Sequence, residues 1–240
     1  MTAKLNIVWF KRDLRITDHQ PLTLAIEAGP VLPLYIVEPE LWAQPDASGR
    51  QWDFAAESLC ELQQALADIG QPLCVMVGDA VQIFEQLHER FGIANLWSHE
   101  ETGNGWTYSR DLAVSAWAKR ASVPWHEPRP FGVIRRLKSR NGWAKAWERD
   151  MASEVTPAPM GLAPLDGDWP THIPSADELG LKPDPCPHRQ PGGRVEKRLL
   201  QRRVPVTRHV AEAGAVVVHP GQQHGPRRGA HRRGVEVGEP

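Results

Sequence analysis

The sequence predicts an α/β fold: a Rossmann-like open sheet of five parallel strands with helices on both faces, followed by a proline-rich linker and an irregular tail. Two observations favour this class. Within the first 150 residues, short apolar runs of strand length alternate with longer segments in which apolar residues recur at helical spacing. Glycines stand just beyond several of the helical segments, where helices commonly end. Alternation of this kind is typical of parallel strands joined by right-handed helical crossovers.

The strands come first because they are the clearest elements. The run Ile7-Val8-Trp9-Phe10 is continuously apolar, which is typical of a strand buried on both faces of a parallel sheet. Four further short runs end at polar residues, Gly or Pro. The expected strands are therefore 6–10, 31–37, 73–77, 94–97 and 123–126.

Helices are expected in the intervals between these strands. The first has Asp18 as its N-cap and ends before Gly29. The others cover about 50–69, the segment from Asp79 to Gly92, and about 107–122. In the longest of them the buried stripe is formed by residues at helical spacing: Phe54, Leu59, Leu62, Leu66 and Ile69.

Composition divides the chain into unlike parts. Residues 188–240 hold 11 Lys and Arg against 4 Asp and Glu, although the whole chain has a net charge of −1. All ten Trp, both Tyr and all five Phe lie at or before Trp169. Prolines crowd the interval 152–193, after a short helix expected at 141–151. We therefore expect an α/β domain at 1–130, a short helix and a Pro/Gly-rich linker at 131–200, and a disordered tail at 201–240.

Several function classes find no support in the residues. No stretch approaches the roughly 18–20 apolar residues of a membrane span, and the N-terminus leads almost directly into a strand, so neither a membrane partner nor a secretory signal is expected. Three cysteines without a CxxC pair favour a cytoplasmic protein. The histidines and Cys186-Pro187-His188 have no convincing ligand spacing, and neither a nucleophile elbow nor a P-loop occurs, so we predict no metal and no catalytic residue.

The candidate binding residues lie in two loops at the carboxyl ends of strands, where α/β proteins most often bind ligands. The first group of candidates consists of the last residue of the first strand and the loop that follows it. The second group lies in the loop at 98–105. In the first, two guanidiniums either bind a carboxylate or phosphate of a ligand, or pair with neighbouring acidic groups. In the second, adjacent glutamates either accept hydrogen bonds from an amine-bearing ring, or pair with Arg12 and Arg110. The candidates are Phe10, Lys11, Arg12, Asp13, Arg15, Glu100 and Glu101.

The segment IVWFKRDLRITDHQPL, at 7–22, resembles the opening of the photolyase/cryptochrome family in its pattern W-F-[KR]-R-D-L-R-x-x-D-x-x-x-L. The segments HEETGNGWTYSRD and RLKSRNGWAKAWERDM extend the resemblance, which covers about residues 5–200. It implies an N-terminal domain that in some members binds an antenna chromophore of folate, deazaflavin or flavin type. The seven candidates are then antenna contacts. In the family a helical domain holds FAD and carries out blue-light-driven repair of pyrimidine dimers in DNA, or photoreception.

After about Leu200 the sequence departs from the family pattern. The family's run resembling T-S-x-L-S-P-x-L, its flavin-cradling polar residues and its electron-relaying tryptophans are missing, and an Arg-, Val-, Gly-, His- and Pro-rich segment follows instead. We interpret the chain as the product of a frameshifted or truncated gene. The FAD site is then absent, and this chain alone is expected to be inactive and not to bind pyrimidine-dimer DNA. A docking face left uncovered, with Trp143, Trp147 and Trp169 as candidates, predicts self-association.

Two other interpretations stay open. One is a free-standing α/β module that binds a nucleotide or chromophore without catalysis. The other is an interaction protein that uses the basic tail on nucleic acid, although a tail without aromatic residues has nothing on which to stack bases.

Overall fold

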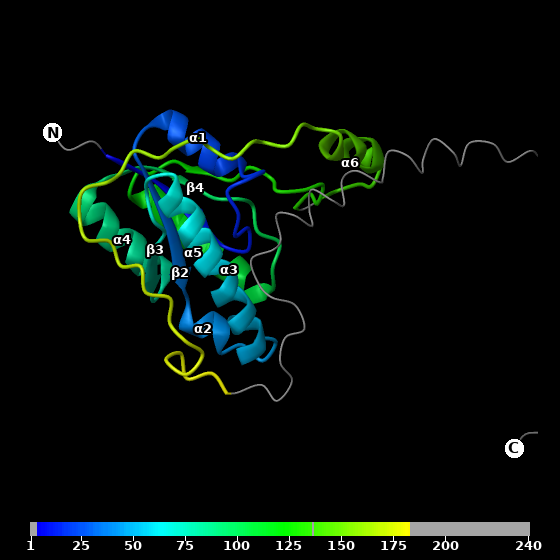
Figure 1. Cartoon of the computed structure of the whole chain (residues 1–240). Helices are drawn as coiled ribbons and strands as arrows, with labels where there is room; N and C mark the ends of the chain where they lie inside the picture. Colours follow the sequence, from blue (N-terminus) through cyan, green and yellow to red (C-terminus); the bar gives the residue numbers. More distant parts are fainter. Residues whose placement is uncertain (1–3, 136, 183–240) are drawn as a thin grey trace, which may run out of the picture. The chain divides into compact units, whose positions relative to one another are not determined.

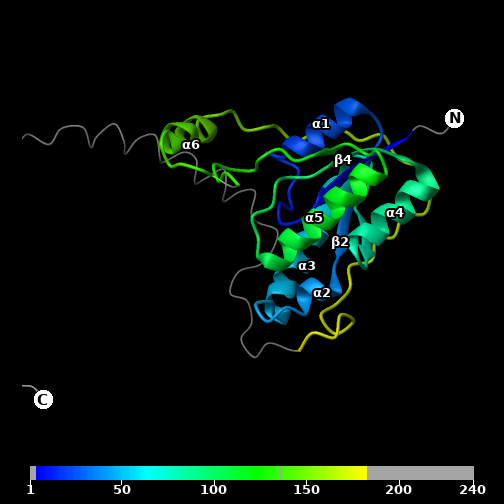
Figure 2. The ribbon, with the colours of Figure 1, turned by 180° about the vertical axis from the view of Figure 1, so that it is seen from behind.

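The structure is a computed structural model in which residues 4–135 and 137–182 are described (Figure 1). The predicted tail at 201–240, and the end of the predicted linker, lie outside the described residues. Within the described part, the predicted fold class is confirmed. Figures 1 and 2 show the central sheet and its covering helices from opposite sides.

Five parallel strands form the sheet: β1 (Leu5–Phe10), β2 (Val31–Val37), β3 (Cys74–Val77), β4 (Ile93–Trp97) and β5 (Trp125–His126). Their spatial order is β3-β2-β1-β4-β5. All six residues of β1 and all seven of β2 are buried, as continuous apolar runs predict for central parallel strands. Because the chain passes from β1 to β2 on one side and returns to β4 on the other, the topological switch point lies between β1 and β4.

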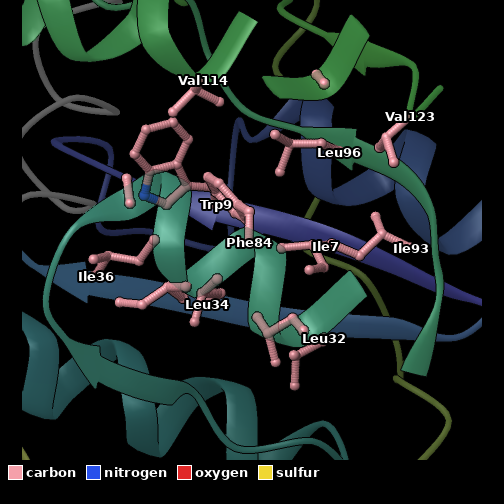
Figure 3. Packing of buried hydrophobic residues seen from close by; sticks show 14 of the residues in the cluster. Ile7, Trp9, Leu32, Leu34, Ile36, Phe84, Ile93, Leu96, Val114 and Val123 are labelled. Carbon is pink, nitrogen blue, oxygen red and sulfur yellow. The ribbon is translucent and has the colours of Figure 1, made fainter. Parts of the chain in front are cut away.

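Helices cover both faces of the sheet. The structure has α1 (Gln20–Ala28), α2 (Pro39–Trp42), α3 (Gly49–Asp68), α4 (Ala80–Phe91), α5 (Gly105–Arg120) and α6 (Trp143–Met151). One core cluster joins the sheet to α4 and α5 and contains the side chains in Figure 3. In it Trp9 meets the ring of Phe84 edge-to-face at 5.1 Å. The second cluster joins the opposite face to α1 and α3.

The start of α1 differs from the sequence prediction. The pattern predicts Asp18 as the N-cap, but the N-cap is His19, whose Nδ1 accepts a hydrogen bond from the backbone N–H of Leu22. Asp18 instead has a positive φ of 55° in the turn before the helix. An imidazole nitrogen placed at the cap satisfies one of the otherwise unpaired N–H groups of the first turn, as an Asp or Ser oxygen does elsewhere.

A short helix that the sequence does not predict follows β2. The pair Glu38-Pro39 indicates the closure of the strand, whereas Pro39 begins the four-residue helix α2. A proline suits this position, because its missing N–H needs no partner in the first turn. The helix brings Leu41 and Trp42 next to α3, and the Trp42 ring meets Trp52 edge-to-face at 4.9 Å.

The proline-rich segment after α6 follows a fixed course along the β3 side of the domain. The backbone N–H of Val75 in β3 donates to the carbonyl of Pro170 over 2.7 Å, and Trp52 Nε1 donates to the carbonyl of Pro174 over 3.0 Å. Leu162 is buried, and its carbonyl lies so close to Gly70 that a Cβ there would come within 2.5 Å of it. These contacts tie the segment to the sheet domain without a helix or strand of its own.

The three tryptophans predicted to lie on an uncovered docking face differ in their exposure. Trp169 is not exposed: its ring packs 4.8 Å from that of Phe91 at the end of α4, because the proline-rich segment carries it onto the core. The expected short helix is confirmed as α6, and Trp143 and Trp147 on it are each 37% exposed. No helix among the described residues is both long and apolar enough to cross a membrane.

Candidate functional site

A cavity of about 480 Å³ opens at the carboxyl ends of β1 and β2, beneath α2 and α3. Parallel α/β sheets bind ligands at this edge, and the volume lies in the range of small-molecule sites. The apolar part of its lining includes three aromatic rings and comprises Phe10, Leu14, Leu41, Trp42, Phe54 and Ala55, among others. The polar part of its lining includes Arg12, Arg15, Tyr35, Glu38, Glu101 and Arg110. The site therefore suits a flat ring with polar edges.

Arg110 of α5 organises the polar side. Its Nη1 donates to Glu38 Oε2 over 2.6 Å, its Nε donates to Asp111 Oδ1 over 3.1 Å, and its Nη2 donates to Glu101 Oε2. The guanidinium carbon also lies 4.6 Å from the centre of the Trp9 ring. A planar guanidinium has the fork geometry that holds several carboxylates at once, so Arg110 fixes acidic groups from the residue after β2, from α5 and from the loop after β4 around one centre.

Glu38 is the most unusual group in the cavity wall. It is 4% exposed, and burial raises its pKa to about 7 despite the neighbouring Arg110. Its Oε2 is bonded to Arg110, but Oε1 is a buried oxygen with no hydrogen-bond partner among the described residues. A buried acceptor without a donor is costly, and such groups in native proteins commonly have a functional reason.

Lys11 also lines the cavity, and its amine belongs to a second group of charges. Its Nζ is 3.8 Å from Asp111 Oδ2 and 3.9 Å from Glu127 Oε1, and 4.8 Å from the centre of the Trp9 ring. Burial lowers its pKa, and Asp111 opposes that shift. The two carboxylates and the aromatic face together keep this buried amine in place.

Asp13 is buried away from the cavity between two imidazoles. Its Oδ2 lies 2.6 Å from His99 Nδ1 and 2.9 Å from His19 Nε2, and its Oδ1 accepts the backbone N–H of Lys11 over 2.9 Å. These donors, with His19 first among them, hold the pKa of Asp13 well below its usual range, although burial raises it.

These three side chains also have the donor types of a metal site, with one ligand atom from each lying within 4.8 Å of the others. The hydrogen bond that caps α1 disfavours metal binding by His19. Because His19 Nδ1 accepts the N–H of Leu22, the proton of the neutral ring belongs on Nε2, which faces Asp13. A metal on Nε2 would require the proton to move to Nδ1, where it would oppose the Leu22 N–H. The cluster is therefore better described as a carboxylate held by two imidazoles.

The seven residues proposed from the sequence separate into two groups. Five line the cavity: Phe10, Lys11, Arg12, Arg15 and Glu101. Asp13 and Glu100 are not among the lining residues, and Glu100 Oε1 instead lies 3.3 Å from Arg135 Nε. The alternative interpretation is that the glutamates pair with Arg12 and Arg110. Glu101 does form both ion pairs, at 2.8 Å with Arg12 and also with Arg110.

Sequence reasoning misses part of the cavity wall. It gives Glu38 only as the end of a strand, Arg110 only as a partner for the glutamates, and Trp42 not at all. A buried run that ends in Glu-Pro is a usable signal, because the carboxyl end of β2 lies beside that of β1 in a parallel sheet. The pairing of Arg110 with Glu38 joins positions 72 residues apart, and no local pattern encodes it.

Comparison with known proteins assigns the family. The family model for DNA photolyase matches residues 6–130. The chain belongs to the DNA photolyase family. Its relatives in that family include the cryptochrome DASH of Gloeobacter violaceus, 29% identical over 200 residues, which cover 76% of this chain and 40% of the relative. Cryptochrome-1 of Sinapis alba is 40% identical over 206 residues, which cover 75% of this chain and 38% of the relative.

Solved photolyase structures share the fold. A bacterial class III photolyase from Agrobacterium tumefaciens superimposes with a TM-score of 0.62 at 24% identity, covering 77% of this chain and 40% of that one. An archaeal photolyase from Sulfolobus tokodaii, solved with two FAD molecules, superimposes with a TM-score of 0.59 at 22% identity, covering 82% and 45%. The chain thus spans less than half the length of these photolyase-family proteins.

Proposed function

We propose that this chain is the antenna-type domain of a photolyase/cryptochrome protein and that the cavity between β1, β2, α2 and α3 binds a chromophore. The observation that carries the proposal is the cavity itself: a space lined by aromatic rings and by charged groups, at the carboxyl edge of a photolyase-family sheet. The Sulfolobus tokodaii structure, which is described as implying a novel light-harvesting cofactor, supports a second chromophore in the family.

The described residues fit such a group. Phe10, Trp42 and Phe54 offer flat apolar surface to a fused ring, and Arg12, with a side chain 63% exposed, offers a cation where a polar tail would leave the cavity. A bound chromophore of folate, deazaflavin or flavin type would absorb blue light and pass the excitation on. Here the protein binds and orients the ring and excludes water from it; no residue of this chain is proposed to be catalytic.

A second part of the proposal concerns the rest of the activity. Dimer repair uses FAD in a helical domain, and the family run expected after residue 200 is missing from this sequence. We therefore propose that the 240-residue chain neither retains FAD nor repairs pyrimidine dimers by itself. We also keep a cytoplasmic location as part of the proposal. Dimer repair in blue light by the purified chain would contradict the proposed inactivity. Translation of the other two reading frames beyond codon 200 tests the proposed frameshift directly.

Titration of the purified chain with riboflavin, 5-deazariboflavin and methenyltetrahydrofolate tests chromophore binding. We expect one of them to bind with a shifted absorption band and quenched fluorescence. AMP and ATP form the comparison set, because a free-standing nucleotide-binding module of the same architecture would bind them instead. Binding of a nucleotide without binding of any chromophore would replace the proposal by that second function.

A further inference from the structure

Glu38 occupies a position in which its side chain has no structural role toward its own helix. It is the N-cap residue of α2, yet its carboxylate makes no cap hydrogen bond; only its backbone carbonyl is used, by the N–H groups of Leu41 and Trp42. Glu side chains are poor caps, so the choice of Glu here is not explained by the helix.

One carboxylate oxygen of Glu38 accepts a hydrogen bond within the described residues, and the other accepts none. Oε2 accepts from Arg110 Nη1 over 2.6 Å, which fixes the plane of the carboxylate. Oε1 is buried and has no donor among the described residues. Since Glu38 lines the cavity and is 4% exposed, the direction left for a donor is the cavity itself.

The surrounding charges decide what that donor is. Glu101 and Asp111 share Arg110 with Glu38, so three carboxylates face one guanidinium at this inner end. An anionic ligand group such as a phosphate or carboxylate would be repelled there. Tyr35 also lines the cavity, and burial together with Glu38 raises the pKa of its phenol, so that it remains neutral. A neutral N–H group fits this charge balance, and the aromatic rings in the cavity lining indicate that it belongs to a flat ring.

We propose that Glu38 Oε1 accepts a hydrogen bond from a ring lactam or imide N–H of the bound chromophore, and so determines which ring edge enters the cavity. The inference rests on the proposed chromophore function and extends it to the ligand's required chemistry. Ring systems without such an N–H, and rings carrying an anionic group on that edge, are excluded from the inner end. The anionic tail of a nucleotide-type chromophore then points to the mouth, toward Arg12.

The test compares two ligands on one protein. Riboflavin has an imide N–H at ring position 3, and N3-methylriboflavin lacks only that donor. A hydrogen bond to a charged acceptor contributes about 1.5–3 kcal/mol, so at about pH 8.5, where Glu38 with its pKa of about 7 is ionised, we expect the methyl derivative to bind the unmodified chain at least about tenfold more weakly. Equal affinity for the two ligands would overturn the proposal, and this measurement needs no variant that must fold.

Glu38→Gln supplies the protein side of the test. Arg110 holds the oxygen of the new amide on its own side, so the NH₂ group replaces Oε1 and an acceptor becomes a donor of the same shape. We expect riboflavin to bind this variant at least about tenfold more weakly, while N3-methylriboflavin loses little further affinity. Glu40→Gln is the matched control, because Glu40 is exposed on the same helix and does not line the cavity.

The outcomes separate the two proposals. If no chromophore of any class binds the unmodified chain, the proposed function and this inference both fall. If riboflavin binds but neither the N3-methyl group nor Glu38→Gln changes its affinity, only the role of Glu38 is overturned. If the variant proves misfolded by circular dichroism, the ligand pair on the unmodified chain decides alone.

Discussion

The two faces of the sheet are built in opposite ways. On the face under α4 and α5, Trp9, Phe84 and Trp117 are almost completely buried, and the Phe84 ring lies 5.1 Å from that of Trp9 and 5.4 Å from that of Trp117. On the face under α1 and α3, a similar apolar core extends toward the carboxyl edge and there gives way to the cavity, with Phe54 only half-buried. The cavity lining also reaches Trp9 and Ile36 at the end of the first face. We call the face under α4 and α5 the closed face and the face under α1 and α3 the open face, and we expect the tight packing of the closed face to support the fold beside the ligand space.

The largest expected change in stability comes from a substitution in the closed face. Phe84→Ala removes a fully buried ring that contacts both Trp9 and Trp117, and we expect it to lower the free energy of unfolding by about 3–5 kcal/mol. Urea denaturation followed by tryptophan fluorescence measures the loss.

Phe54→Ala is the matched change on the open face. Since the Phe54 ring borders a cavity, we expect a loss of stability below about 2 kcal/mol, together with at least a tenfold loss of riboflavin affinity. Equal stability losses for the two variants, with riboflavin binding retained in Phe54→Ala, would show that the faces do not differ in these roles.

The sequence is sufficient for the central strands and for most of the helices on both faces, because their signals are local. Continuous apolar runs predict β1 and β2, and helical spacing predicts α3 and α4 to within a few residues. Glycines mark the ends of α1 and α4. The predicted cap of α1 is wrong, since His19 takes the place of Asp18. The second strand does end before Glu38-Pro39 as predicted, but Pro39 also begins a short helix that the sequence does not predict.

The open face can be predicted only in part. Phe10, Arg12 and Glu101 follow from the rule that ligands meet the carboxyl ends of strands. Arg110 and Trp42 depend on how α5 and α2 dock, which no pattern along the chain specifies. The prediction for Trp169 is wrong for the same reason, since its contact with Phe91 depends on the path of a proline-rich segment without regular structure.

The next effect is the pH dependence of stability that arises from His19, which lies beside the open face. Burial lowers the pKa of His19, against the opposing effect of Asp13, so the folded chain keeps this ring neutral more strongly than the unfolded chain does. Below the unfolded value of about 6.5 the unfolded state binds more protons, and stability falls as the pH falls. For one group the slope is at most about 1.4 kcal/mol per pH unit.

His19→Asn removes this titration, since Asn retains a cap acceptor for Leu22 but does not titrate, while Asp13 keeps its contact with His99 and its bond from the Lys11 N–H. We expect the stability of the unmodified chain to fall relative to the Asn variant by about 1 kcal/mol between pH 7.5 and 5.5. Glu38, with its pKa raised to about 7, has the opposite sign, because its folded form takes up a proton on acidification; it is present in both proteins and cancels. Parallel stability curves would show that His19 does not carry this dependence.

The smallest effect on stability is expected outside both faces, among the exposed apolar residues of α6 and the loop before it, which we call the α6 patch: Phe131, Val133, Leu137, Trp143 and Trp147. Trp143 Nε1 donates to the carbonyl of Gly132, and the Trp147 ring lies so close to Gly132 that a Cβ there would come within 2.3 Å of Cδ1. Each ring thus covers the neighbouring loop with one side and leaves the other uncovered.

Replacing both tryptophans with serine should lower the free energy of unfolding by less than about 1 kcal/mol, because each ring is already 37% exposed. We expect the double replacement to change self-association instead. In light scattering at tens of micromolar, the measured mass of the unmodified chain should exceed the monomer mass of 26.8 kDa, and that of the double variant should not. Met160→Ser is the control, since Met160 is 99% exposed and lies outside the α6 patch. Riboflavin affinity should be the same in all three proteins, because none of the replaced residues lines the cavity. A monomeric unmodified chain would remove the α6 patch as a self-association surface, and a loss of ligand binding in the double variant would connect it to the open face after all.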